Sequence, residues 1–186
     1  MMSDTILSIF LGIGLSASVG FRVFLPLFAL SLAAYFGVWE LNASWQWIGS
    51  NVALVTLGIA TLVEITAYYI PVVDNALDTI AIPLATIAGT AVMVSTVADL
   101  SPVITWALAI IAGGGTAAAV KSSASATRLG TTVSTAGFGN PVVSTIETGT
   151  SVVMSIVSIF LPILAFVCVL GIFYLVYKLY KKLRSN

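Results

Sequence analysis

The chain of 186 residues contains no histidine and only one cysteine, Cys168. Without histidine it cannot form a Ser-His-Asp triad, and a lone cysteine can form neither an internal disulfide nor a cysteine-cluster zinc site. We therefore expect no enzymatic activity and no cofactor. A serine nucleophile activated by Lys121 is the remaining enzymatic alternative, but the sequence does not indicate which serine would be its partner.

Charge is also scarce. Only 8% of residues are charged while 59% are hydrophobic, and the mean hydropathy is +1.12. A soluble surface normally needs about a quarter or more of its positions charged. The composition thus predicts an integral membrane protein. Seven basic and seven acidic residues cancel, which gives no reason to expect a nucleic-acid partner.

Long apolar runs mark candidate membrane spans at 5–37, 52–70, 79–97 and 103–120, and from about 151 onward. One membrane-spanning helix needs roughly 20 residues. The runs predict an all-α, polytopic membrane helix bundle that forms a single domain over residues 1–186. Residues 38–50 carry three tryptophans among polar side chains and are predicted to form an interfacial loop.

The first apolar run is too long for one helix and contains residues that interrupt helices. Its glycines and serines, followed by Arg22 and Pro26, predict two helices or half-helices joined near residues 16 to 22. Residues 121–150 are rich in serine, threonine, glycine and alanine, which predicts tight helix packing or a re-entrant segment. An exposed loop is the alternative for this stretch.

A small-residue motif occurs twice. Residues 16–18 read Ser-Ala-Ser and precede Arg22, and residues 123–125 read Ser-Ala-Ser and precede Arg128. Inverted repeats with broken helices are a recurring design of membrane transporters. An internal inverted repeat is one interpretation. Chance is the other, because the serine-to-arginine spacing differs between the two copies and small residues are common throughout.

The two ends of the chain predict its orientation. Residues 1–4 carry no basic group, so the first apolar run does not have the pattern of a cleavable signal peptide. The last run ends in tyrosines followed by a basic cluster, which is typical of an aromatic belt and a positive-inside anchor. The C-terminus is therefore predicted to be cytoplasmic. The basic cluster consists of Lys178, Lys181, Lys182 and Arg184.

Three segments carry a resemblance to a known family: GLSASVGFRVFLPLFAL at 14 to 30, EITAYYIPVVDNALDT at 64 to 79 and STAGFGNPVVSTIE at 134 to 147. In this order they resemble the domain-of-unknown-function 4126 family of small bacterial integral membrane proteins. The resemblance covers most of the chain. It implies a compact multi-helix domain in the bacterial inner membrane, but it assigns no activity and no binding residues.

Eight ionisable residues lie within or beside the apolar runs. Each costs about 2.5 to 3.5 kcal/mol at a helix centre on insertion scales, so such residues usually face the protein interior, pair with one another or line a path. We predict pairs of arginine and glutamate, either within each half of the chain or crossed between halves. Such pairs could pin broken helices or form a gate. The eight are Arg22, Glu64, Asp74, Asp78, Asp99, Lys121, Arg128 and Glu147.

A secondary polar site is predicted at Asp74, Asp78, Asp99 and Lys121. Asp74 and Asp78 are four residues apart and would share one helical face, which suits capture of a divalent cation. A helix-capping turn after Pro71 is an equally good interpretation. For the three aspartates we favour positions at the aqueous ends of spans, where a charge costs little, and whether a metal binds stays open.

The leading functional hypothesis is a transporter or channel for an ion or small polar solute. Its path would be lined by Arg22, Glu64, Arg128 and Glu147, with cations slightly favoured because the internal charges have an excess of acids. The alternatives are a membrane scaffold or accessory subunit, and a lipid-handling protein. Expected partners are the lipid bilayer and a second copy of the chain or another membrane protein.

Overall fold

The computed structural model describes residues 2–97 and 100–184, and this part of the chain contains helices and no strand. The prediction of an all-α fold is confirmed. In chain order the elements are α1 (Met2–Phe21), α2 (Phe24–Tyr35), the 3-10 helix η1 (Ala43–Gly49), α3 (Asn51–Ala67), α4 (Pro71–Thr96), α5 (Pro102–Leu108), the π-helical turn η2 (Ala109–Gly114), α6 (Gly115–Thr135), α7 (Asn140–Phe160) and α8 (Pro162–Arg184).

Proline defines where several helices begin. Its missing N–H and fixed φ suit the first helical position, where the N–H has no partner within the helix. Four of the six prolines stand at the first positions of α4, α5, α7 and α8; they are Pro71, Pro102, Pro141 and Pro162. The chain is thereby divided into helices at the points where it reverses direction.

Several described helices are long and apolar enough to cross a membrane. They cover Asp4–Phe21, Ala76–Thr96, Pro102–Thr135 and Asn140–Phe160, and η1 with α3 forms a further pair bent by 63°. The chain is a multi-pass membrane protein. The span expected at 103–120 instead continues through α5, η2 and α6 for 34 residues. At 1.5 Å per residue this is about 51 Å, well beyond a hydrocarbon core of about 30 Å.

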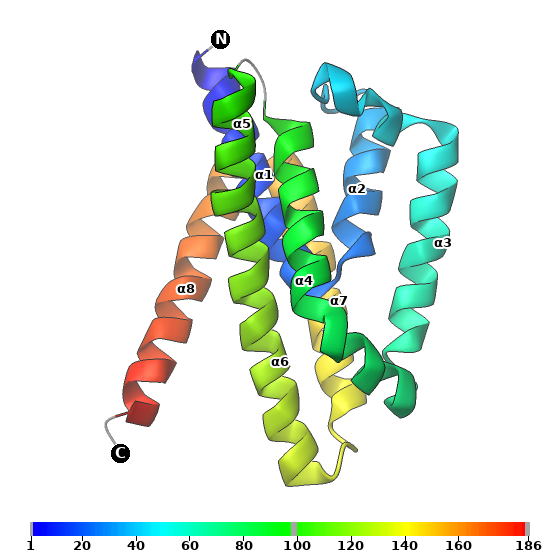
Figure 1. The fold of residues 1–186 in the computed structure, drawn as a ribbon, viewed down its shortest axis with the longest axis vertical. Helices are drawn as coiled ribbons and strands as arrows, with labels where there is room; N and C mark the ends of the chain where they lie inside the picture. Colours follow the sequence, from blue (N-terminus) through cyan, green and yellow to red (C-terminus); the bar gives the residue numbers. More distant parts are fainter. Residues whose placement is uncertain (1, 98–99, 185–186) are drawn as a thin grey trace.

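Helix α1 is the centre of the bundle. It packs against α4, α6, α7 and α8, while α3 lies at one edge and packs mainly against α2 (Figure 1). The chain then turns back within the bundle, because α1 and α2 run in opposite directions and meet partway along the length of α6 (Figure 1). The junction is Arg22–Val23, at the end of the predicted interval of residues 16 to 22.

Small residues allow the central helices to approach closely. Ser16 on α1 donates to the carbonyl of Gly89 on α4 at 3.0 Å. The Ser18 hydroxyl lies 2.9 Å from that of Ser151 and 2.8 Å from that of Ser155, both on α7. Such contacts between small polar residues are a common way for membrane helices to associate when lipid offers no hydrophobic drive.

Residues 121–150 form a helical hairpin. They supply the second part of α6, a short turn and the first half of α7. Ala136 and Gly137 in the turn have positive φ angles of 51° and 86°, and Phe138 is 88% exposed. The two helices are buried along their inward faces, whereas Leu129 and Val133 are 68% and 87% exposed. The prediction of tight packing therefore holds for the inward faces alone, and the exposed connection is a short turn.

The two Ser-Ala-Ser motifs have different local structures. The first lies in α1 shortly before its end, whereas the second lies inside the unbroken helix α6. An internal inverted repeat thus gains no support from the backbone around these motifs and stays a prediction.

Candidate functional site: a buried charge cluster

Seven of the eight predicted ionisable residues meet in one place inside the bundle. We call them, together with Tyr68, the charge cluster. All are buried except Asp78, whose side chain is 24% exposed. Asp99 lies outside the described residues. The members are Arg22 at the α1–α2 junction, Glu64 on α3, Tyr68 directly after it, Asp74 and Asp78 on α4, Lys121 and Arg128 on α6, and Glu147 on α7.

Arg128 forms the most extensive ion pairs of the cluster. Its Nε donates to both carboxylate oxygens of Glu147 at 3.0 and 3.1 Å, and its Nη2 donates to Glu147 as well. Its Nη1 forms an ion pair with Asp74. The Asn140 amide also donates to Asp74, at 3.3 Å. The structure therefore brings Arg128 and Glu147 together as the sequence predicted, and adds Asp74.

Asp74 lies in the first turn of α4, just before the apolar span Ala76–Thr96, as predicted for the end of a span. The expected exposure to water is wrong, because Asp74 is only 1% exposed and is paired with Arg128. Because Asp74 is occupied by Arg128, it does not form a free carboxylate pair with Asp78. Among the described residues there is no group of three or more side chains of the types that hold metal ions.

Arg22, in the first half of the chain, contacts residues of α7 in the second half. Its Nε donates to Thr148 Oγ1 at 2.9 Å, and its Nη2 donates to the Ser144 carbonyl at 2.9 Å, both on α7. Its Nη1 lies 3.4 Å from Glu147 Oε2. In the part of the chain that the structure describes, Nη1 has no hydrogen-bond partner. Of the two predicted pairing schemes, Arg22 follows the crossed one.

Glu64 caps a helix and makes no ion pair with any residue that the structure describes. Its two carboxylate oxygens accept from the backbone N–H groups of Val23 and Phe24, at 2.7 and 2.9 Å. These N–H groups stand at the start of α2, whose N-cap residue, Val23, has no side chain that could accept from them. The N-terminus of a helix carries unpaired donors and a partial positive charge, both of which favour a carboxylate. Glu64 therefore stabilises the break between α1 and α2 through the backbone of α2. It does not form the predicted ion pair with Arg22 among the described contacts.

Tyr68 is the centre around which the cations gather. The Arg22 Cζ, Arg128 Cζ and Lys121 Nζ atoms lie 4.1, 4.5 and 5.1 Å from the centroid of its ring. A cation over an aromatic face gains about 0.5–2 kcal/mol, depending on how far it is desolvated. The ring thus gives three like charges a shared aromatic partner. Sequence reasoning missed Tyr68, because neither its type nor its spacing distinguishes it from the neighbouring Tyr69.

Asp78 and Lys121 are paired only loosely. The Lys121 Nζ lies 4.0 Å from Asp78 Oδ1 and donates to the Tyr68 hydroxyl at 3.2 Å. Arg128 Nη1 lies 4.0 Å from Asp78 Oδ2. Both distances exceed the range of a hydrogen bond. Asp78 Oδ1 is buried and has no hydrogen-bond partner among the described residues.

A hollow of about 270 Å³ lies beside Asp78, between α4 and α6. Ser125 also lines it, and its hydroxyl is likewise buried without a hydrogen-bond partner in the described part of the chain. The two residues that carry these unpaired oxygens therefore line the same hollow, and the oxygens themselves lie just beneath its wall. An unsatisfied buried polar group usually indicates a bound water, an ion or a functional role.

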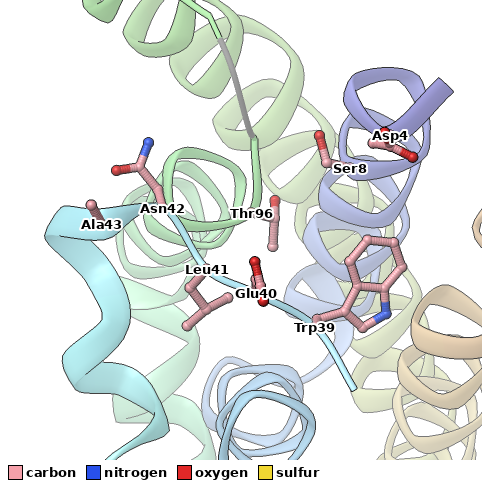
Figure 2. A pocket seen from close by; sticks show the side chains of 8 residues that line it. All are labelled: Asp4, Ser8, Trp39, Glu40, Leu41, Asn42, Ala43 and Thr96. Carbon is pink, nitrogen blue, oxygen red and sulfur yellow. The ribbon is translucent and has the colours of Figure 1, made fainter. Parts of the chain in front are cut away.

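Two other hollows lie apart from this one. The first, of about 560 Å³, lies near the N-terminal end of the bundle between α1 and residues 39–43, with Asp4 and Glu40 among its lining (Figure 2). The second is an apolar crevice of about 430 Å³ between α2, α3 and α4, and it reaches Glu64 and Tyr68. The charge cluster thus borders a polar hollow on one side and an apolar crevice on another.

A family model described as a domain of unknown function (DUF4126) matches residues 9–182. The chain belongs to this family. No curated protein and no solved structure matches it. The matched range of this DUF4126 chain contains the whole charge cluster, and all three segments that carried the resemblance contribute to it. Asn140 and Ser144, which sequence reasoning had not selected, come from the third of these segments.

Proposed function

We propose that the protein is a transporter or channel for a cation or another small polar solute, and that the solute interacts with the charge cluster. The observation that carries this proposal is the loose pairing of Asp78. Its Oδ1 atom is buried and lacks a hydrogen-bond partner among the described residues, while the residue itself is partly exposed and lines a hollow. A carboxylate in this condition is suited to bind a cation from solution.

The charge balance of the cluster supports a cation. Three basic residues, Arg22, Lys121 and Arg128, face four acidic ones, Glu64, Asp74, Asp78 and Glu147. The described cluster thus has one excess negative charge. An uncompensated charge is costly inside a membrane protein, and one added cation would neutralise it.

The contacts divide the cluster into a fixed part and an exchangeable part. Arg128, Glu147 and Asp74 are held by several hydrogen bonds, and Glu64 by two backbone donors. These residues are suited to pin helices together. Asp78 and Lys121 have freedom to exchange partners. The transport role is therefore assigned to them in place of the four residues that the sequence alone favoured for the path.

The proposed setting is the bacterial inner membrane, with the C-terminus in the cytoplasm. The basic residues that follow the last apolar run support this orientation through the positive-inside rule. Self-association, or association with another membrane protein, fits the many exposed apolar side chains on the outer helices. No nucleic acid is expected among the partners.

Two rival functions each rest on an observation. Most charges of the cluster are paired, which suits a scaffold whose charges only hold helices. The apolar crevice beside Glu64 and Tyr68 suits a protein that handles lipids. Purification from native membranes distinguishes them, because a scaffold would bring a stoichiometric protein partner and a lipid-handling protein would bring bound phospholipid.

The test of transport is flux through liposomes that contain the purified protein. Cation and anion fluxes are measured separately and compared with those of protein-free liposomes of the same lipid composition. We expect cation flux above the protein-free rate. No flux of any ion or polar solute tried, together with a stoichiometric partner in native membranes, would favour the scaffold and contradict the proposal.

A further inference from the structure

We propose that Asp78 Oδ1 and Ser125 Oγ form a binding site for a monovalent cation, a proton or Na⁺, and that the Lys121 ammonium is a tethered competitor for this site. The inference rests on the proposed function, which it deepens by naming the ligand and the residues that hold it. Binding can nevertheless be measured without any transport.

The chemistry of the two oxygens suits a small cation. A carboxylate oxygen and a hydroxyl oxygen are both hard ligands of the kind that small cations prefer. Both atoms are buried, both lack hydrogen-bond partners in the described part of the chain, and both residues line the hollow of about 270 Å³. The hollow has room for water molecules that would complete the coordination of a metal ion.

Lys121 is placed to act as the competitor. Lys121 is 1% exposed. Within the described part of the chain its ammonium has one hydrogen bond, to Tyr68, in addition to the contact of 4.0 Å with Asp78. In the absence of a bound cation, Lys121 compensates part of the charge of Asp78 from a distance. When a cation binds, Lys121 retains Tyr68 as a partner. The exchange therefore leaves neither group without a polar partner.

The other charged groups around Asp78 determine how strongly the site would attract a cation. From α6 it faces Lys121 and Arg128, from α7 Glu147, and from its own helix Asp74. Farther across Tyr68 lie Glu64 and Arg22. Because Arg128 is already bound to Glu147 and Asp74, Lys121 is the neighbouring cation with the fewest partners, and it is the one that an incoming cation would displace.

The first test measures cation-dependent stability of the purified full chain in detergent. The midpoint of thermal unfolding is compared in NaCl and in choline chloride at equal ionic strength, and then at several pH values in choline chloride. We expect Na⁺ or a lower pH to raise the midpoint in the wild type. The Asp78→Asn variant should lose this response, and Glu40→Gln, an exposed acid outside the cluster, should keep it.

The two arms identify the ligand. A response to Na⁺ at fixed pH indicates the metal ion, and a response to pH alone indicates the proton. Removing the competitor with Lys121→Gln should strengthen the response, with apparent affinity roughly tenfold tighter because a positive charge about 4 Å away is lost. The site is contradicted if neither condition changes the midpoint, or if Asp78→Asn responds like the wild type.

A second measurement avoids variants that change the charge of the cluster. In a Cys168→Ser background, Leu129→Cys places an accessible thiol at the hollow and keeps both proposed ligands, and its rates of reaction with cationic and anionic thiol reagents are compared. We expect the cationic reagent to react faster, by about tenfold, and Na⁺ or a lower pH to reduce this preference. Equal rates for the two reagents would overturn the proposed site.

The outcomes separate this inference from the proposed function. Stability that depends on Asp78 and on a cation, in protein that shows no flux, supports the site and contradicts transport. Flux without any such stability or reagent preference supports transport and contradicts the site.

Discussion

Arg128 and Asp78 belong to the same cluster but make very different contacts, and their variants should differ accordingly. Removing one partner of a buried ion pair leaves the other charge uncompensated, which costs about 3–5 kcal/mol. Arg128 compensates two buried carboxylates, whereas Asp78 is partly exposed and its Oδ1 makes no hydrogen bond to the residues that the structure describes. The fixed and the exchangeable parts of the cluster are therefore distinguishable by stability alone.

We predict that Arg128→Leu lowers the free energy of unfolding by about 3–5 kcal/mol. Asp78→Asn, which is nearly isosteric and removes the excess negative charge, should change it by less than about 1 kcal/mol. Denaturant titration in detergent micelles provides both values. Equal losses for the two variants would show that the cluster is uniformly structural.

Glu64 provides a second prediction, because it caps α2 from another helix. Glu64→Ala leaves the N–H groups of Val23 and Phe24 without their acceptors, and each unpaired buried donor costs about 1–3 kcal/mol. We expect faster hydrogen exchange of these two amides, measured by mass spectrometry. Glu40→Gln serves as the control because Glu40 is exposed and lies outside the cluster. Unchanged exchange at residues 23 and 24 would contradict the capping role.

The sequence identified which charges lie inside the membrane protein but not how they combine. Scarcity of charge and its position in apolar runs were sufficient to select Arg22, Glu64, Arg128 and Glu147. Their partners depend on how five helices pack, which is not encoded in spacing along the chain. Glu64 is the clearest example, because its partner is a backbone break that was predicted separately, near residues 16 to 22.

Close packing of α4 against η2 and α6 depends on glycine. A Cβ atom at Gly89 would lie 2.5 Å from the Ala117 Cβ and 2.8 Å from the Gly113 carbonyl oxygen. Neither neighbour has a flexible side chain that could move away. The helices would have to separate, and the hydrogen bond from Ser16 to the Gly89 carbonyl would be disturbed.

We predict that Gly89→Ala lowers the free energy of unfolding by about 1–3 kcal/mol, the usual cost of overpacking. Gly149→Ala is the matched control, because Gly149 lies in α7 and a Cβ there would meet no atom within 4 Å. The control should be neutral or stabilising by up to about 1 kcal/mol. The measurement is thermal unfolding of the two variants and the wild type under the same conditions. A Gly89→Ala variant as stable as the wild type would contradict the close contact between the helices.

The positions of the helices could be predicted from the apolar runs wherever proline or a polar segment marked their ends. The length of α6 could not be predicted in this way, because serine, threonine and glycine after residue 120 are also typical of linkers in soluble proteins. Their helical structure depends on packing against other helices and on side chains that bond to their own helix, as in Ser122, Ser123 and Thr127. Composition alone could not distinguish a continuous helix from a linker in this segment.

The arrangement of the bundle predicts which ends of the protein reach each side of the membrane. The chain segment with η1 lies at the opposite end of the bundle from the C-terminal end of α8 (Figure 1). With the C-terminus in the cytoplasm, η1 would face outward. In a Cys168→Ser background, Gln46→Cys should react with a membrane-impermeant thiol reagent in intact bacterial cells, whereas Lys181→Cys should react only in inside-out vesicles. The reverse pattern would invert the proposed orientation.

The central claim is that cation movement depends on Asp78, while the rest of the charge cluster holds the bundle together. Its most direct test is cation flux into liposomes that contain equal amounts of folded wild-type protein, Asp78→Asn or the control Glu40→Gln. We predict flux in the wild type and the control, and a loss of at least about tenfold in Asp78→Asn, since the variant removes the only charge that the site offers to a cation. Wild-type flux in Asp78→Asn would contradict the claim.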